Sequence, residues 1–216
     1  MKPIFKIKEI KQGIFLFEFK NNYDMCMHFL RYQEFYESSS PKFRGKKFEI
    51  FDFMRWYAHK FGKGVFTYTD DWDGFNIPGD VIKKVNNLYI EDKNIYDYEM
   101  MMAWKQCQAK VDGKFYIIGV VKGSGALTHE IAHGMFYLVP EYKKEMTKLV
   151  KALEPAINKE MNLTLKSLGY TPKVFVDETQ AYMATGLSYS FDDTTSWPDE
   201  RKLFEEVFKK YNRKTK

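Results

Sequence analysis

The sequence predicts an α+β fold, with a small sheet in the first half of the chain and a mainly helical second half. Alternating apolar and polar residues on both sides of Lys11-Gln12-Gly13, within Ile4–Lys20, indicate a β-hairpin. The run Phe115–Val121 is rich in β-branched and aromatic residues, which indicates a buried strand. Beyond this run, apolar residues recur at the three- and four-residue spacing of amphipathic helices.

The first half also carries signals for further elements. Helical apolar spacing, turn residues and β-branched runs each predict a separate segment. The expected elements are helices over Asp24–Glu37, Phe48–Phe61 and Tyr96–Gln108, a strand over Val65–Thr69, and a short helix that begins at Pro78-Gly79-Asp80 and ends near Leu88.

The second half predicts a series of helices. Ser124 is the expected N-cap of a helix that ends near Val139. Pro140 suits the first turn of the next helix, which we expect to run to Gly169 with a kink at Pro155. The last two expected helices run from Thr171-Pro172 to Gly186 and from Trp197-Pro198 toward the end of the chain.

Length and composition fit one globular domain. The chain has 216 residues, of which 44% are hydrophobic and 29% charged, and these values exclude a disordered or fibrous protein. No apolar run approaches the roughly 18 residues of a spanning helix, and the first residues contain no secretory signal. Two cysteines are too few for a disulfide scaffold. We therefore expect a cytoplasmic protein with no membrane partner.

The net charge of +5 is concentrated near the end of the chain. Residues 200–216 hold seven basic and three acidic residues, whereas the other 199 positions hold 27 basic and 26 acidic residues. Nucleic-acid-binding proteins usually concentrate basic charge on a docking face. A nucleic-acid partner is therefore not expected, and the basic end is interpreted as a solvated tail.

The motif THEIAHG, at residues 128–134, carries the chemical signal. On a helix, His129 and His133 are i,i+4 neighbours, so both imidazoles can bind one metal ion. Glu130 lies at the edge of the same face, where it can reach a metal-bound water without binding the metal. Nearly opposite the histidines is an apolar stripe that is expected to face the core. This stripe consists of Leu127, Ile131, Met135 and Leu138.

This motif and the strand before it resemble the zincins, the HExxH zinc metallopeptidases. In that superfamily the active-site helix follows a sheet whose edge strand holds the peptide substrate, and Phe115–Val121 followed by Ser124–Val139 is similar to this arrangement. The resemblance covers Phe115–Gly186. It implies a single zincin-like domain over residues 1–216. Residues 1–114 would form an N-terminal lobe of unrecognised type, and residues 115–216 the metal-binding catalytic half.

Catalytic zinc usually has three protein ligands and a water molecule, so two histidines are not a complete site. The metzincin pattern HExxHxxGxxH would require Gly and His where Phe136 and Val139 stand, which excludes that clan. The gluzincins instead use a Glu from a later helix, often within E-x-x-A. The resemblance therefore implies Glu178 as the third ligand, followed by the small residue Ala181.

The third ligand stays open, because Asp177 or a residue that the sequence does not identify could take the place of Glu178. If Glu178 is the ligand, Asp177 is one candidate for the residue that orients a histidine. Thermolysin-like enzymes carry an orienting Asp one turn after the ligand Glu, and this chain has Tyr182 there. The donor that stabilises the oxyanion is also open. Tyr182 is the first candidate, and the others are Tyr189, His28 and His59.

The resemblance implies a zinc-dependent peptidase with one catalytic Zn²⁺ and a peptide or protein substrate. Glu130 would act as the general base that takes a proton from the activated water and passes it to the leaving amine. Two alternatives remain from the sequence. One is a non-catalytic zincin-fold module that binds a peptide or protein. The other is a zincin that acts on nucleic-acid-associated proteins.

Overall fold

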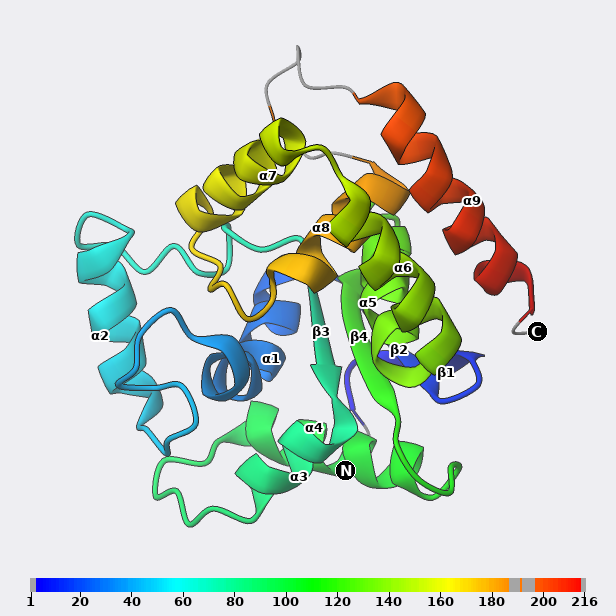
Figure 1. Ribbon diagram of the computed structural model, residues 1–216. Coiled ribbons are helices and arrows are strands. Elements are labelled where there is room, and N and C mark those ends of the chain that lie inside the picture. The colour runs from blue at the N-terminus through cyan, green and yellow to red at the C-terminus, as the bar shows by residue number, and fades with distance from the viewer. Residues whose placement is uncertain (1–2, 187–190, 192–196, 215–216) are drawn as a thin grey trace. The chain divides into compact units, whose positions relative to one another are not determined.

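The computed structural model describes residues 3–186, 191 and 197–214 of the chain (Figure 1). The chain divides into two compact units, residues 1–127 and residues 128–216. The sequence-based lobe boundary at 114/115 lies inside the first unit, because the strand that follows it pairs within the sheet of that unit. Among the described residues, no helix combines the length and apolar character that a membrane span requires.

The first unit contains a four-stranded mixed sheet with the strand order β1-β2-β4-β3, which confirms the expected α+β class. Strands β1 and β2 form the predicted antiparallel hairpin, β2 runs parallel to β4, and β3 is antiparallel to β4. The strand bounds are Lys6–Lys11 for β1, Ile14–Phe19 for β2, Gly74–Pro78 for β3 and Tyr116–Val121 for β4.

Strand β4 lies inside the sheet, so the expectation that it is an edge strand is wrong. Ile118 is paired with Leu16 of β2 on one side and with Asn76 of β3 on the other. Residues 116–120 of β4 are all buried, as is usual for a strand that is covered on both faces. Because neighbours use its backbone groups on both sides, β4 cannot hold a peptide by strand addition. The edges of the described sheet are β1 and β3.

The predicted strand over Val65–Thr69 is also wrong, because this segment forms turns. Its aromatic side chains take part in an aromatic cluster rather than in a ladder. Phe66 stacks on Tyr68 with ring centroids 5.9 Å apart, and Tyr68 meets Phe53 edge to face at 5.6 Å. The aromatic and β-branched residues of this segment therefore resemble a strand in the sequence but serve the packing of the cluster.

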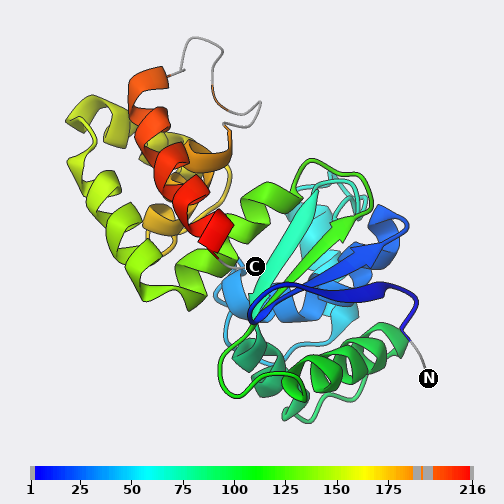
Figure 2. The same cartoon turned by 90° about the vertical axis from the view of Figure 1, so that its right-hand side faces the viewer.

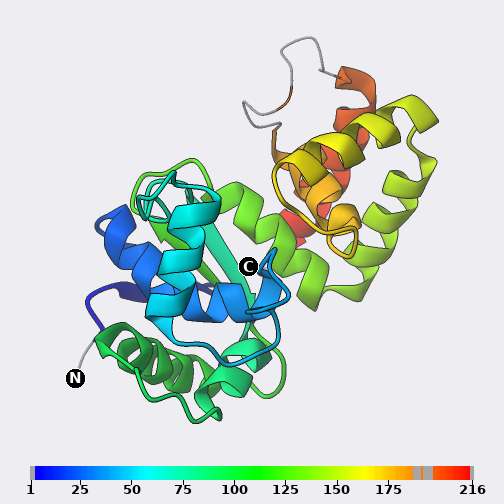
Figure 3. The same cartoon turned by 90° about the vertical axis from the view of Figure 1, so that its left-hand side faces the viewer.

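Helix α1 (Asn22–Glu37) covers one face of the sheet and contacts β2, β3 and β4 (Figure 3). Gly119 permits this approach, since a Cβ atom there would lie 2.3 Å from Cε2 of Phe29. Phe29 in turn stacks on Phe75 of β3 at 5.1 Å. The other helices of this unit, all expected from the sequence, are α2 (Ile50–Lys60), α3 (Gly79–Asn86) and α4 (Ile95–Gln108).

The second unit is helical in the part that is described. Helix α9 lies along α8 and α6 (Figure 2). Its buried Phe204 and Phe208 are four residues apart on one face. The helices are α5 (Leu127–Leu138), α6 (Pro140–Ala152), α7 (Pro155–Ser167), α8 (Phe175–Thr185) and α9 (Pro198–Lys214).

Pro155 breaks the predicted long helix instead of kinking it. Glu154 has φ −55° and ψ 143°, an extended conformation that a following proline favours. Helix α6 therefore ends at Ala152, and Pro155 occupies the first turn of α7.

The predicted start and core-facing side of α5 also need correction. The helix begins at Leu127, and Ser124 lies in the preceding turn, where its backbone N–H donates to the carbonyl of Val121 at 3.0 Å. Met135 of the apolar stripe is fully buried, but Leu127, Ile131 and Leu138 are only half-buried. The face that carries His133 is at least as buried as the stripe, because side chains of α8 contact it.

Candidate metal centre

Helix α5 presents two adjacent imidazoles, as the i,i+4 spacing predicts. The ring centroids of His129 and His133 are 4.8 Å apart, and their Nε2 atoms are 3.1 Å apart. His133 is buried, whereas the side chain of His129 is 20% exposed. The pair is therefore largely shielded, and only His129 is partly accessible to solvent.

Helix α8 brings Glu178 to the two imidazoles. Its Oε2 atom lies 3.8 Å from Nε2 of His129 and 3.7 Å from Nε2 of His133. One ligand atom from each of the three residues lies within 4.8 Å of the others. Oε2 of Glu178 is buried, and the described part of the chain offers it no hydrogen-bond partner. Burial of a carboxylate oxygen without a hydrogen bond is costly, and a bound cation would remove that cost.

Hydrogen bonds determine which ring nitrogens face the shared space. The Oδ1 atom of Asp177 lies 2.9 Å from Nδ1 of His133, and a carboxylate only accepts, so Nδ1 carries the hydrogen. The hydroxyl of Thr185 donates to the carbonyl of Ala181 at 2.7 Å and therefore accepts from Nδ1 of His129 at 3.3 Å. Both Nε2 atoms are left to direct lone pairs into the same space.

This donor set fits a metal ion. Two lone pairs that face each other at 3.1 Å repel unless a proton or a cation lies between them. Ligand atoms about 2.0–2.1 Å from a tetrahedral zinc ion lie roughly 3.3 Å from each other. The distance between the two nitrogens is close to that value, and the distances to the carboxylate oxygen are somewhat longer. His129, His133 and Glu178 can therefore hold one ion.

The electrostatics of the site also favour a cation. Burial by itself lowers the pKa of His133, but the charges of Asp177, Glu178 and Glu130 and the hydrogen bond to Asp177 raise it to about 10. Without a metal, His133 is therefore protonated at neutral pH, with its second hydrogen on Nε2. This hydrogen is directed at Nε2 of His129, so a bound metal ion would replace it between the same two nitrogen atoms.

Glu130 follows His129 directly on α5 and is buried, and its charge acts on His133. The ring of Tyr182 packs on His129, with centroids 4.6 Å apart. Tyr170, which precedes α8, was missed by the sequence reasoning. Burial, the charges of Glu178 and Glu130 and a hydrogen bond with Tyr182 raise the pKa of Tyr170 well above its ordinary value. Its hydroxyl therefore remains protonated beside these carboxylates.

Thr185, which lies on the predicted ligand helix, was also missed by the sequence analysis. It lies eight residues after Asp177 on the same helix, so α8 orients both histidines, one from each end. A hydroxyl at this spacing from the predicted ligand is too common a pattern to be recognised in a sequence. Tyr170 carried a comparably weak signal, namely its position just before the expected ligand helix.

The other candidates for the oxyanion donor lie in the first unit or outside the described residues. His28 is buried in the first unit, where its Nδ1 lies 2.6 Å from the carbonyl of Asp24 and its Nε2 lies 3.1 Å from Glu99. Both ring nitrogens are thus engaged, which removes His28 as a donor. His59 is exposed on α2 of the same unit. Tyr189 lies outside the described residues.

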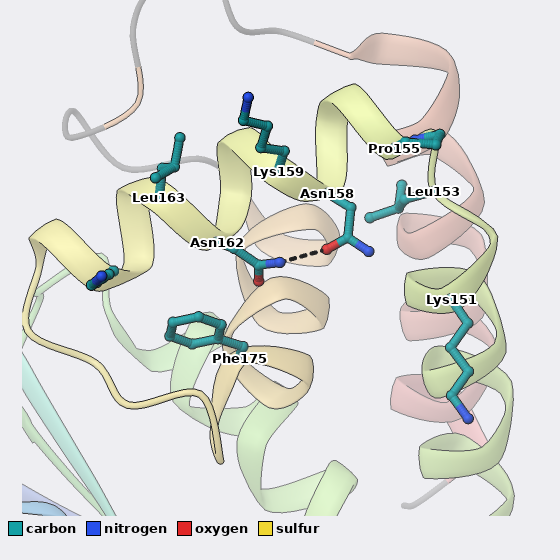
Figure 4. Close-up of a pocket in the computed structure, with 9 residues that line it drawn as sticks. Lys151, Leu153, Pro155, Asn158, Lys159, Asn162, Leu163 and Phe175 are labelled. Carbon is teal, nitrogen blue, oxygen red and sulfur yellow. Dashed lines mark hydrogen bonds between the residues drawn. The ribbon is translucent and has the colours of Figure 1, made fainter.

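A hollow of about 630 Å³ lies elsewhere in the second unit, beside α7, and none of the metal-binding side chains lines it. Phe175 and Leu153 contribute apolar surface, and Asn162 donates to Asn158 at 2.9 Å. The ammonium groups of Lys151 and Lys159 point in different directions (Figure 4). Without convergent polar groups, this hollow gives no indication of a ligand.

Comparison with protein-family models, curated proteins and solved structures finds no significant match to this chain. The functional assignment therefore depends on the residues of the metal centre.

Proposed function

We propose that this chain is a zinc-dependent metallopeptidase of the gluzincin type, in which His129, His133 and Glu178 hold one catalytic Zn²⁺. The observation that carries this proposal is the convergence, next to a buried glutamate, of two Nε2 atoms and a carboxylate oxygen that has no hydrogen-bond partner among the described residues. Two imidazoles and one carboxylate are the ligands of several catalytic zinc sites, whereas magnesium and calcium prefer oxygen ligands alone.

A bound zinc ion supplies a Lewis acid, which acidifies water and polarises a carbonyl oxygen. The chain supplies the base. Glu130 follows His129 directly on α5, and its burial beside His133 keeps it near the metal-binding pair. In this position Glu130 takes a proton from water and delivers it to the leaving amine.

Two tyrosines supply hydrogen-bond donors to a developing oxyanion. Tyr182 packs on His129, and Tyr170 forms a hydrogen bond with Tyr182. Because the pKa of Tyr170 is raised, this hydroxyl donates throughout the physiological pH range. A preorganised donor of this kind stabilises the transition state more than the substrate.

The test combines zinc analysis with peptide cleavage. The purified chain is loaded with zinc, and a peptide library is incubated with the wild type, with Glu130→Gln and with the matched control Glu141→Gln, an exposed position on α6. We expect Glu130→Gln to keep its zinc and its melting temperature and to lose about 10²–10⁴-fold in cleavage rate. The control should cleave like the wild type.

Two results would contradict the proposal. Cleavage by Glu130→Gln at the wild-type rate would assign the chemistry to other residues. A wild-type chain that binds zinc stoichiometrically but cuts no peptide would indicate a non-catalytic binding module.

A further inference from the structure

A chain of hydrogen bonds continues from His133 away from the metal centre. The Oδ1 atom of Asp177, which accepts from His133, also accepts from Nε2 of Gln180 at 3.0 Å. The Oε1 atom of Gln180 accepts in turn from the hydroxyl of Tyr142 at 2.7 Å. Gln180 and Tyr142 are both 0% exposed. The four residues connect α5, α8 and α6, and we call them the relay.

Each hydrogen-bond donor in the relay fixes the orientation of the next side chain. Burial and the charge of Asp177 raise the pKa of Tyr142, so its hydroxyl keeps its hydrogen. A hydroxyl that donates to Oε1 determines which way the amide of Gln180 faces, and the NH₂ group is then directed at Asp177. In the opposite orientation, the amide oxygen would face a carboxylate, and two acceptors would meet.

Asp177 needs this support because its side chain is 30% exposed. Water can compete for its oxygens, and a partly exposed carboxylate has other rotamers available. The bond from Gln180 adds a second donor to the oxygen that accepts from His133. Gln180 is itself held by Tyr142, whose ring is fully buried. The position of Asp177 is therefore anchored in the interior.

We propose that Tyr142 and Gln180 are positioning residues of the metal centre, which hold Asp177 against Nδ1 of His133 and so keep Nε2 directed at the metal. The metal itself rests on the proposed function. The arrangement of the relay does not, because all four residues are bonded without an ion.

The first measurement is the zinc dissociation constant, determined by competition with a chelator. Tyr142→Phe keeps the ring and removes the hydroxyl, and we expect zinc affinity to fall about threefold to tenfold. Gln180→Met keeps the length of the side chain and removes both polar groups, and we expect a loss of about tenfold. Tyr211→Phe is the control. Its ring packs on Tyr142 at 5.6 Å, but its hydroxyl donates to Glu145, so its zinc affinity should not change.

A double-mutant cycle separates positioning from general stabilisation. If Tyr142 acts through Asp177, then Tyr142→Phe should have no further effect on zinc affinity in an Asp177→Ala background. A change in helix packing would instead reduce zinc affinity by the same factor in both backgrounds. That second result would overturn the proposal.

The metal-free protein provides an independent readout. Exchange of the His133 Nδ1 hydrogen with water, followed by NMR, should be slow in the wild type and in Tyr211→Phe and several-fold faster in Tyr142→Phe. Unchanged exchange in both Tyr142→Phe and Gln180→Met would refute the relay. A wild-type chain that binds no zinc would refute the proposed function, and the exchange measurement would still decide the relay.

Discussion

The Oδ1 atom of Asp177 lies 2.9 Å from Nδ1 of His133, and the Oε2 atom of the next residue, Glu178, lies 3.7 Å from Nε2 of the same ring. Two consecutive acidic residues thus contact opposite sides of one imidazole. Only the Nε2 side is shared with His129. If the proposed metal ion is bound, this geometry favours Glu178 as its ligand and Asp177 as the residue that orients His133, a choice that the sequence left open.

Replacement of Asp177 by Asn should weaken zinc binding about 10–100-fold without abolishing it, because an orienting charge is lost while the three ligands remain. Zinc stoichiometry after a mild chelator challenge measures the effect. Asp199→Asn, at an exposed position of α9, is the matched control and should keep its zinc.

Glu178→Ala should lose much more zinc than Asp177→Asn, because two imidazoles alone hold the ion weakly. Added zinc should raise the melting temperature of the wild type but not of this variant, since a ligand stabilises the native state in proportion to its binding. If Asp177→Ala loses the metal and Glu178→Ala retains it, the ligand assignment and the gluzincin type are both wrong.

Zinc binding should release about one proton near neutral pH, because His133 has a pKa of about 10 without the metal. Calorimetry in buffers of different ionisation enthalpy measures this number. The folded-state pKa lies above the ordinary value of about 6.5. The stability contributed by protonated His133 is therefore fully present below about pH 6.5 and is lost as the pH rises to about 10. No proton release at pH 7 would contradict this assignment.

Tyr170→Phe should lower kcat about 10–100-fold and leave zinc content and melting temperature close to wild type, because it removes one donor and keeps the ring. Tyr211→Phe, which removes a hydroxyl bonded to Glu145, should keep the wild-type kcat. A rise in KM with an unchanged kcat would show that Tyr170 binds the substrate and does not stabilise the transition state.

Glu34, in the first unit, provides a separate test of stability against pH. Burial raises the pKa of Glu34 to about 7, although the neighbouring hydroxyl groups of Ser38 and Tyr68 oppose this shift. The free energy of unfolding should therefore fall as the pH rises from about 4.5 to about 7. Glu34→Gln cannot ionise and should be more stable than the wild type by about 3 kcal/mol above pH 7. Denaturant unfolding at several pH values, with exposed Glu91→Gln as control, measures the difference.

The sequence by itself determined the features that depend on neighbours along the chain. The hairpin on both sides of Gly13, most of the helices and the adjacent imidazoles of His129 and His133 follow from periods of two and 3.6 residues. Such features need only local geometry. The same local signals failed where packing decides. The apolar run of β4 has the same pattern in an interior strand and in an edge strand, and Phe66 and Tyr68 pack in an aromatic cluster without forming a strand.

Only the tertiary structure decided how the centre is completed. Asp177 and Thr185 reach the histidines across 44 and 56 residues of sequence, and Tyr142 reaches Gln180 across 38. Each of these contacts depends on where α8 and α6 pack, and helix packing depends on side chains distributed over several elements. A sequence motif specifies which residues share a helix face. Which carboxylate meets which nitrogen is specified by how another helix packs. Consecutive residues of a helix point in different directions, so the rotation of that helix about its axis decides which of them reaches each nitrogen.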